Sequence, residues 1–151
     1  MATGSGGIDR RGFLQGSLFL SAVAPLCCTT PLAPPESFSF EGTTLVLDLR
    51  RIPDLRGVGS ACAVADAARK LNIIVARPEA RRYAAIDRSC THGGAQCAYV
   101  HRRRRLRCTS VNHAEFELDG TLLHGRTHGN LRAYTVRLDG TRLLIAMEEK
   151  A

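Results

Sequence analysis

The chain has 151 residues, which is enough for one ordinary domain and little beyond it. Hydrophobic residues make up 44% of the chain but aromatic residues only 5%, with no tryptophan, so we expect a mainly aliphatic core. The formal net charge of +7 suits a solubilising surface or a docking face for acidic partners. A basic charge also suggests nucleic-acid binding. However, the basic run Arg102–Arg105 is short and lies between candidate metal ligands, so we expect no nucleic-acid partner.

The N-terminus has the pattern of an export signal. The segment Asp9-Arg10-Arg11-Gly12-Phe13-Leu14-Gln15 opens an apolar run that extends from Phe13 to Cys28. A paired arginine before a moderately apolar run resembles a twin-arginine signal; an ordinary Sec signal and a short buried helix are the alternatives. The run has about 16 residues, fewer than the roughly 20 that a membrane span needs. We therefore expect residues 1–28 to be a signal or an N-terminal anchor, with cleavage left open.

Export by the twin-arginine route implies a protein that is translocated folded. It places the protein in the periplasm or on the outer face of the cytoplasmic membrane, where the N-terminal segment allows membrane association. Residues 29–37 are rich in proline and are expected to form an extended linker. Residues 38–151 are then the folded domain.

Short strand-like segments separated by turn residues predict an all-β domain. Asp119-Gly120 and Asp139-Gly140 are strong hairpin signals, and a further turn is expected at Pro78-Glu79. The Ala-rich segment 61–71 is the one place where a helix competes, although the preceding glycines favour a strand. The expected architecture is a small antiparallel sandwich or barrel. Its strands are predicted within residues 38–49, 61–66, 70–77, 82–87, 98–101, 106–108, 115–118, 121–123, 131–138 and 142–146.

The six cysteines do not suggest a dense disulfide scaffold. Two lie in the N-terminal apolar run, and two are spaced with histidines as Cys90-Thr91-His92 and Cys108-Thr109-Ser110-Val111-Asn112-His113. The fifteen residues between His92 and Cys108 suit two loops that an intervening hairpin brings together. Zinc usually takes like ligands at close spacing, whereas each half here mixes one thiolate with one imidazole. That mixture favours a binuclear cluster, with a zinc-binding structural or sensory module as the alternative.

The segment Cys90-Thr91-His92-Gly93-Gly94 resembles the first box of the Rieske family. The resemblance covers about residues 38–147, including Phe116 to Thr121 and the closing Leu131 to Val136. It implies a Rieske-type antiparallel fold with two cluster-binding loops and one [2Fe–2S] cluster per chain. Cys90 and Cys108 would bind one iron, and His92 and His113 the other. Such clusters have potentials of roughly −150 to +300 mV.

The second box departs from the family pattern of Cys-x₂-His-Gly. Four residues separate Cys108 from His113, and Ala114 stands in place of the glycine. His124 and His128, each in a loop that contains glycine, are therefore the rivals for the second imidazole ligand.

The disulfide that braces the cluster loops in respiratory members lacks its second cysteine here, because Thr109 and Ser110 stand there. Cys97, near the position of the first, is expected to be a buried free thiol or to pair with Cys62. Phe116 cannot donate a hydrogen bond to the cluster as the tyrosine of high-potential members does, so we expect a lower potential than in respiratory centres.

These features predict an exported protein that carries single electrons and has no substrate site of its own. It would act as a free carrier or as the small subunit of an oxidoreductase, resembling that of arsenite oxidase. The expected partner is a redox protein, either a cytochrome or an oxidoreductase large subunit. The outer edges of His92 and His113 are expected to face that partner.

Overall fold

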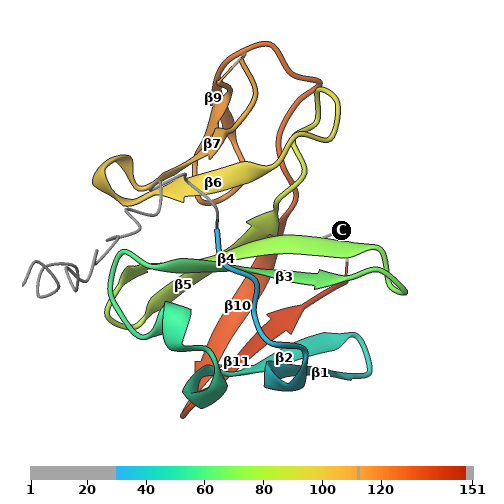
Figure 1. Ribbon diagram of the computed structural model, residues 1–151, viewed down its shortest axis with the longest axis vertical. Coiled ribbons are helices and arrows are strands. Elements are labelled where there is room, and N and C mark those ends of the chain that lie inside the picture. Colours follow the sequence, from blue (N-terminus) through green and yellow to red (C-terminus); the bar gives the residue numbers. More distant parts are fainter. Residues whose placement is uncertain (1–29, 112, 149–151) are drawn as a thin grey trace, which may run out of the picture.

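The computed structural model describes residues 30–111 and 113–148, which form two antiparallel β-sheets (Figure 1). These residues contain eleven strands and four short 3₁₀ turns but no α-helix. The all-β prediction is therefore confirmed. The twin-arginine segment lies outside the described residues. No helix within them is long and apolar enough to cross a membrane.

The larger sheet has seven strands in the order β1-β2-β11-β10-β5-β4-β3. The pairs β1–β2, β3–β4, β4–β5 and β10–β11 are hairpins, and β11 pairs with β2, so the two ends of the domain meet in one sheet. The strands are β1 (Phe38–Glu41), β2 (Thr44–Asp48), β3 (Ala61–Asp66), β4 (Leu71–Glu79), β5 (Arg82–Asp87), β10 (Ala133–Asp139) and β11 (Arg142–Ala146). Three of the 3₁₀ turns, Pro35–Ser37, Leu49–Arg51 and Pro53–Leu55, flank β1 and β2.

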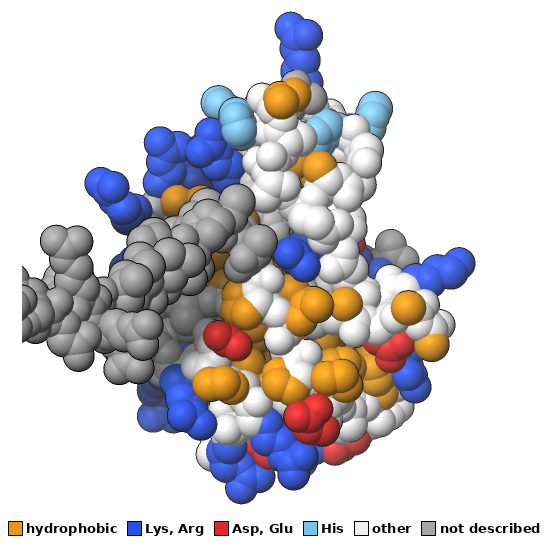
Figure 2. Space-filling view, viewed as in Figure 1, with side chains coloured by type: hydrophobic (Ala, Val, Ile, Leu, Met, Phe, Trp, Pro, Cys, Tyr) orange, Lys and Arg blue, Asp and Glu red, His pale blue; other side chains and the backbone are white. Residues whose placement is uncertain are grey.

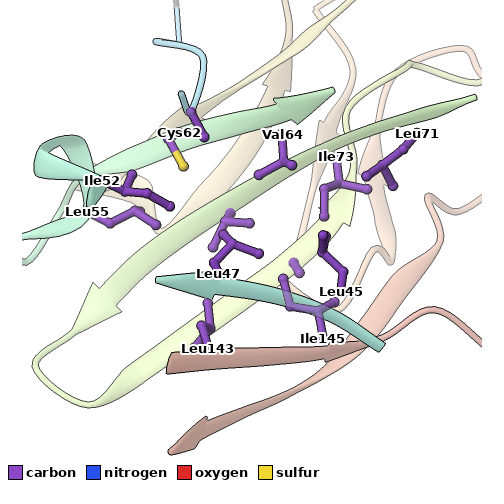
Figure 3. Close-up of a cluster of buried hydrophobic side chains, with 13 residues drawn as sticks. Leu45, Leu47, Ile52, Leu55, Cys62, Val64, Leu71, Ile73, Leu143 and Ile145 are labelled. Atoms are coloured by element: carbon purple, nitrogen blue, oxygen red, sulfur yellow. The ribbon is translucent and has the colours of Figure 1, made fainter. Parts of the chain in front are cut away.

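The larger sheet curls so that strands distant in its order share one core. Figure 3 shows aliphatic side chains of β2, β3, β4 and β11 pointing toward one another. Leu45, Leu47, Ile73 and Leu143 have no exposed surface. β4 is buried on both faces, because Ile73 packs in this core whereas its neighbour Ile74 packs against the second sheet. This double burial explains why β4 reads as a continuous β-branched run rather than an alternating one.

The smaller sheet is inserted between two neighbouring strands of the larger one. Its order is β6 (Cys97–Val100), β7 (Arg105–Cys108), β8 (Glu115–Phe116) and β9 (Leu122–His124), with a 3₁₀ turn at His101–Arg103 between β6 and β7. The chain leaves the larger sheet after β5 and re-enters it at β10, where Ile86 pairs with Ala133. The inserted segment therefore begins and ends at one place.

Polar contacts fix the base of this insertion. The Asp87 amide donates to the Arg132 carbonyl at 2.8 Å, and the Tyr134 hydroxyl donates to the Asp87 carboxylate at 2.6 Å. On the other side, the Asn72 amide of β4 donates to Ser89 Oγ at 3.0 Å and to Gln96 Oε1 at 2.9 Å. The larger sheet thus holds both ends of the loop that contains Cys90.

Most of the predicted strands are present, and two predictions, for residues 38–49 and for the turn at Pro78-Glu79, differ from the structure. Residues 38–49 form the hairpin β1–β2 rather than one strand, because Gly42 adopts a left-handed φ of +60° that reverses the chain. The strand predicted at residues 61–66 is confirmed, and the competing helix is wrong. The turn predicted at Pro78-Glu79 lies two residues later, because β4 continues through Glu79.

The N-terminal edge of the described chain packs against β3. Leu32 bridges to Ala63 in parallel, and the backbone of Ala33 donates to the Ala63 carbonyl at 2.8 Å. Ala33 is buried in the core of the larger sheet. Residues 31–33 therefore extend the sheet at its β3 edge.

The core makes a stability prediction. Leu47→Ala removes most of a fully buried side chain, and the surrounding residues relax only partly into the cavity. We therefore expect the free energy of unfolding to fall by about 2–5 kcal/mol. Val58, which is 54% exposed, provides the control, and Val58→Ala is expected to change stability by less than about 0.5 kcal/mol. Urea denaturation of both variants measures the difference, and equal midpoints would contradict this account of the core.

Candidate metal centre

The first loop, from Cys90 to Ala95, is closed by its own backbone. The Cys90 amide donates to the Ala95 carbonyl at 2.7 Å, and the Gly94 amide donates to the Cys90 carbonyl at 3.1 Å. Gly94 has a φ of +75°, which only glycine adopts readily, so the Gly-Gly pair is required by the tight return of the chain. The Cys97 amide then donates to the Arg88 carbonyl at 2.7 Å and ties the end of the loop to its beginning.

The β6–β7 hairpin places a second cysteine beside this loop. Cys97 and Cys108 are direct cross-strand partners. Their amides point away from each other, since Cys97 donates to Arg88 and Cys108 to the Ala114 carbonyl. They are therefore a non-hydrogen-bonded pair, the type in which side chains lie closest, and both project on one face of the hairpin.

Three buried thiols meet where the loop and the hairpin converge. The Sγ atoms of Cys90, Cys97 and Cys108 all lie within 4.8 Å of one another. Their side chains are at most 2% exposed and belong to the core of the smaller sheet. Burial raises the pKa of the Cys97 thiol above its ordinary value, and the neighbouring Cys90 and Cys108 add to the rise. Burial is also the largest cause of the raised pKa of Cys90. Such a group favours a bound cation, which stabilises the thiolate form.

His92 lies against this thiol group with both ring nitrogens engaged. Its Nδ1 is 2.8 Å from Cys90 Sγ, and its Nε2 is 2.8 Å from the hydroxyl of Ser110. The same hydroxyl lies 3.2 Å from Cys108 Sγ. His92 is half-buried. The outer edge of its ring, at Nε2, contacts Ser110 and does not lie free for a partner. Ser110 therefore links the imidazole of the first loop to the thiol of the second.

His113, His124 and His128 lie in or beside loops around the site without joining the thiol group. All five histidines of the chain fall between residues 92 and 128, and Figure 2 shows histidine side chains gathered at the end of the molecule formed by the smaller sheet. His113 is exposed, has a left-handed φ of +45°, and donates its amide to the Ser110 carbonyl at 3.0 Å. His124 and His128 are also exposed. The choice of the second imidazole ligand stays a prediction.

The loop that carries His128 contacts the first loop directly. Thr91 Oγ1 donates to the Gly129 carbonyl at 3.3 Å. Gly125, in the same loop, approaches the second loop so closely that a Cβ there would lie 2.6 Å from the Cα of Ala114. Three loops therefore surround the thiols, and each contains a candidate histidine.

Two residues of this site were not predicted from the sequence as parts of it. Cys97 was expected to be a free thiol or a partner of Cys62. Both are free, and Cys62 packs in the other core, where burial raises its pKa to about 12, so the two do not pair. Ser110 was considered only as the residue standing where a cysteine was missing. The strand register that makes Cys97 face Cys108 is the signal that would have found the third thiol.

Much of the basic run beside the site is paired internally. Glu115 is buried, and its carboxylate lies 2.5 Å from Arg103 Nη1 and 3.5 Å from Arg105 Nη1. Arg104 lies 2.9 Å from Glu79. These contacts hold the β6–β7 turn against β8 and β4. The arginines that the sequence suggested as part of a docking face therefore have a structural role.

The donor set fits a thiophilic metal group. It combines buried thiols with an imidazole whose second nitrogen is held by a hydroxyl, as the ligands of protein metal sites commonly are. Two of the thiols and the imidazole, those of Cys90, Cys108 and His92, are three of the four expected ligands. The expected fourth, His113, is in the loop that Ser110 belongs to.

Comparisons with known proteins agree with this description at the level of the fold. No family model matches the chain. No curated protein is matched either. Solved structures do match. The ferredoxin of carbazole 1,9a-dioxygenase from Nocardioides aromaticivorans IC177 is 22% identical, with a TM-score of 0.55 over 68% of this chain and 95% of that chain.

Two further matches are named Rieske proteins. The quaternary ammonium Rieske monooxygenase CntA is 18% identical, with a TM-score of 0.50 over 65% of this chain and 30% of that chain. The plasma membrane Rieske protein PetC3 from Synechocystis PCC 6803 is 25% identical, with a TM-score of 0.43 over 49% of this chain and 75% of that chain. With its two antiparallel sheets and its cysteine-rich loops, the chain has the fold of the Rieske proteins.

Proposed function

We propose that this protein carries single electrons on a Rieske-type [2Fe–2S] cluster. Cys90 and Cys108 would hold one iron, and His92 and His113 the other. The observation that supports this most strongly is the meeting of Cys90, His92 and Cys108 from two loops at one buried place. Cys108 is far in sequence from Cys90 and His92, yet these three of the four expected ligands lie close together without any rearrangement of the strands.

The chain contributes orientation, burial and hydrogen bonding to such a group. Backbone hydrogen bonds fix the Cys90 loop, and the hairpin register fixes Cys108. Ser110 holds His92 by Nε2, which leaves Nδ1 on the side of the thiols as the nitrogen suited to a metal. When bound, the cluster supplies a one-electron redox couple. Because four protein ligands complete it, substrate would have no open position there.

The cellular context of the proposal rests on the N-terminal sequence. The twin-arginine-like segment supports export to the periplasm or the outer face of the cytoplasmic membrane. The protein would act there as a free carrier or as the small subunit of an oxidoreductase, and its partner would be another redox protein. The structural matches are to a ferredoxin of one oxygenase and to part of a second oxygenase. Both matches support an electron-carrying role for this chain.

Electron paramagnetic resonance of the dithionite-reduced full chain tests the proposal. We expect a Rieske-type signal in the wild type, because imidazole ligation of one iron lowers the negative charge of the cluster and sets its electronic structure. Among the variants His113→Ala, His124→Ala and His128→Ala, only the first is expected to lose the signal. The other two serve as matched controls, since all three histidines are exposed and in neighbouring loops.

The outcomes separate the parts of the proposal. Loss of the signal only in the His124 or His128 variant would keep the electron carrier and reassign the fourth ligand. A colourless wild-type protein that contains zinc and gives no signal after iron loading would refute the electron-transfer function.

Ser110 gives a second prediction, which concerns the reduction potential. With iron bound, its hydroxyl would donate to the Cys108 thiolate and stabilise the reduced state. Ser110→Ala should therefore lower the potential by roughly 40 mV, which for one electron corresponds to about 1 kcal/mol. Thr109→Ala is the control, because the Thr109 hydroxyl donates to the Gln96 carbonyl and not to sulfur. Equal shifts in the two variants on redox titration would argue against a specific role of Ser110.

A further inference from the structure

The proposed cluster leaves one of the three thiols without a function. A Rieske-type cluster takes two thiolates, so the third cysteine, Cys97, has no iron to bind. Yet Cys97 Sγ lies within 4.8 Å of both other sulfurs and is fully buried. A thiol held this close to two metal-binding thiols has the position of a ligand.

The three thiols and His92 match the donor set of a mononuclear site. Cys₃His is one of the common structural zinc sets, and its Zn–S distance of about 2.3 Å puts tetrahedral sulfurs about 3.8 Å apart. The sulfurs here are within 4.8 Å of one another, so they need approach by no more than about 1 Å. Nδ1 of His92 lies 2.8 Å from Cys90 Sγ but is not within 4.8 Å of all three sulfurs, so the imidazole would move toward them to supply the fourth donor.

We propose that the cluster-free protein binds one zinc-class divalent cation through Cys90, Cys97, Cys108 and His92. This goes beyond the proposed function, because it gives the same group of thiols a second metal-bound state with a different ligand set. Cys90, Cys108 and His92 belong to both sets, so the cation and the cluster exclude each other. His113 belongs only to the cluster, and Cys97 only to the cation.

The surrounding structure suits a small closed site. Main-chain hydrogen bonds preform both the Cys90 loop and the β6–β7 register, so little ordering is needed on binding. Ser110 already holds Nε2 of His92, as a residue outside the ligand set commonly does for a zinc-bound imidazole. Each of the three thiols is almost inaccessible to water, which suits a structural ion rather than one that exchanges its ligands with solvent.

Cobalt substitution tests the site in the reduced, cluster-free full chain. Titration with Co²⁺ should give the intense visible bands of tetrahedral thiolate coordination at one ion per chain, and Zn²⁺ should displace it. Cys97→Ser and Cys97→Ala should each weaken Co²⁺ binding at least tenfold. Cys62→Ser is the matched control, because Cys62 is equally buried but lies in the other core, and its Co²⁺ affinity should equal that of the wild type. Circular dichroism of every variant identifies those that fold.

Wild-type affinity in a folded Cys97 variant, or no tetrahedral bands in the wild type, would overturn the proposal. The wild type also offers a test that needs no substitution. This test remains usable if both Cys97 variants fail to fold. Each bound thiol releases its proton, so Zn²⁺ should release about three protons through three cysteines but about two through Cys90 and Cys108 alone. Calorimetry in two buffers of different ionisation enthalpy measures this number, and a value near two would overturn the role of Cys97.

The same variants keep this inference separate from the proposed function. If both hold, iron-loaded Cys97→Ala retains the Rieske-type signal while losing Co²⁺ affinity. If the wild type binds Co²⁺ through Cys97 but never gives the signal, the cation site stands and the electron carrier fails. If the signal is present and Cys97→Ala binds Co²⁺ normally, the electron carrier stands and the cation site fails.

Discussion

The pairing of Cys97 with Cys108 across the β6–β7 hairpin is the constraint on which the whole site depends. A slip of one residue in this register would turn Cys108 to the opposite face and separate it from Cys90. The Arg-rich turn helps to hold the register, because Arg103 and Arg105 contact the buried carboxylate of Glu115 on β8. The basic run therefore has a structural role close to the proposed metal ligands.

The larger sheet serves as a platform for this arrangement. The inserted segment leaves and re-enters it at the β5–β10 pair, and Asn72 of β4 holds the residues next to Cys90 and Cys97. Because backbone and buried polar contacts hold the cysteines and His92, the site would need little reorganisation when charge changes on a bound metal. Low reorganisation is what a carrier of single electrons requires, and it equally favours tight binding of a structural ion. The two proposed metal states follow from the same preorganised group of thiols.

The sequence predicted the all-β class and most strand positions because its turns are strongly marked by glycine, as at Gly120 and Gly140. The prediction of one strand over residues 38–49 was wrong, because Gly42 reverses the chain between β1 and β2. Local spacing suggested Cys90, His92 and Cys108 as ligands, and the structure brings these three close together. The nearness of Cys97 depends on a cross-strand register that local spacing does not encode, and Ser110 depends on how the second loop returns toward His92. The second histidine was the weakest inference because the loop departs from the family pattern there, and His113 does bend the chain through a left-handed conformation at that point.

The central claim is that one iron of a binuclear cluster is bound by two histidines. Electron–nuclear double resonance on reduced protein labelled with ¹⁵N-histidine counts these ligands directly, since only nitrogen bound to the paramagnetic cluster couples strongly. Two strongly coupled histidine nitrogens are predicted. One coupled nitrogen, or none, would contradict the Rieske-type assignment even if the sample contained iron and sulfide.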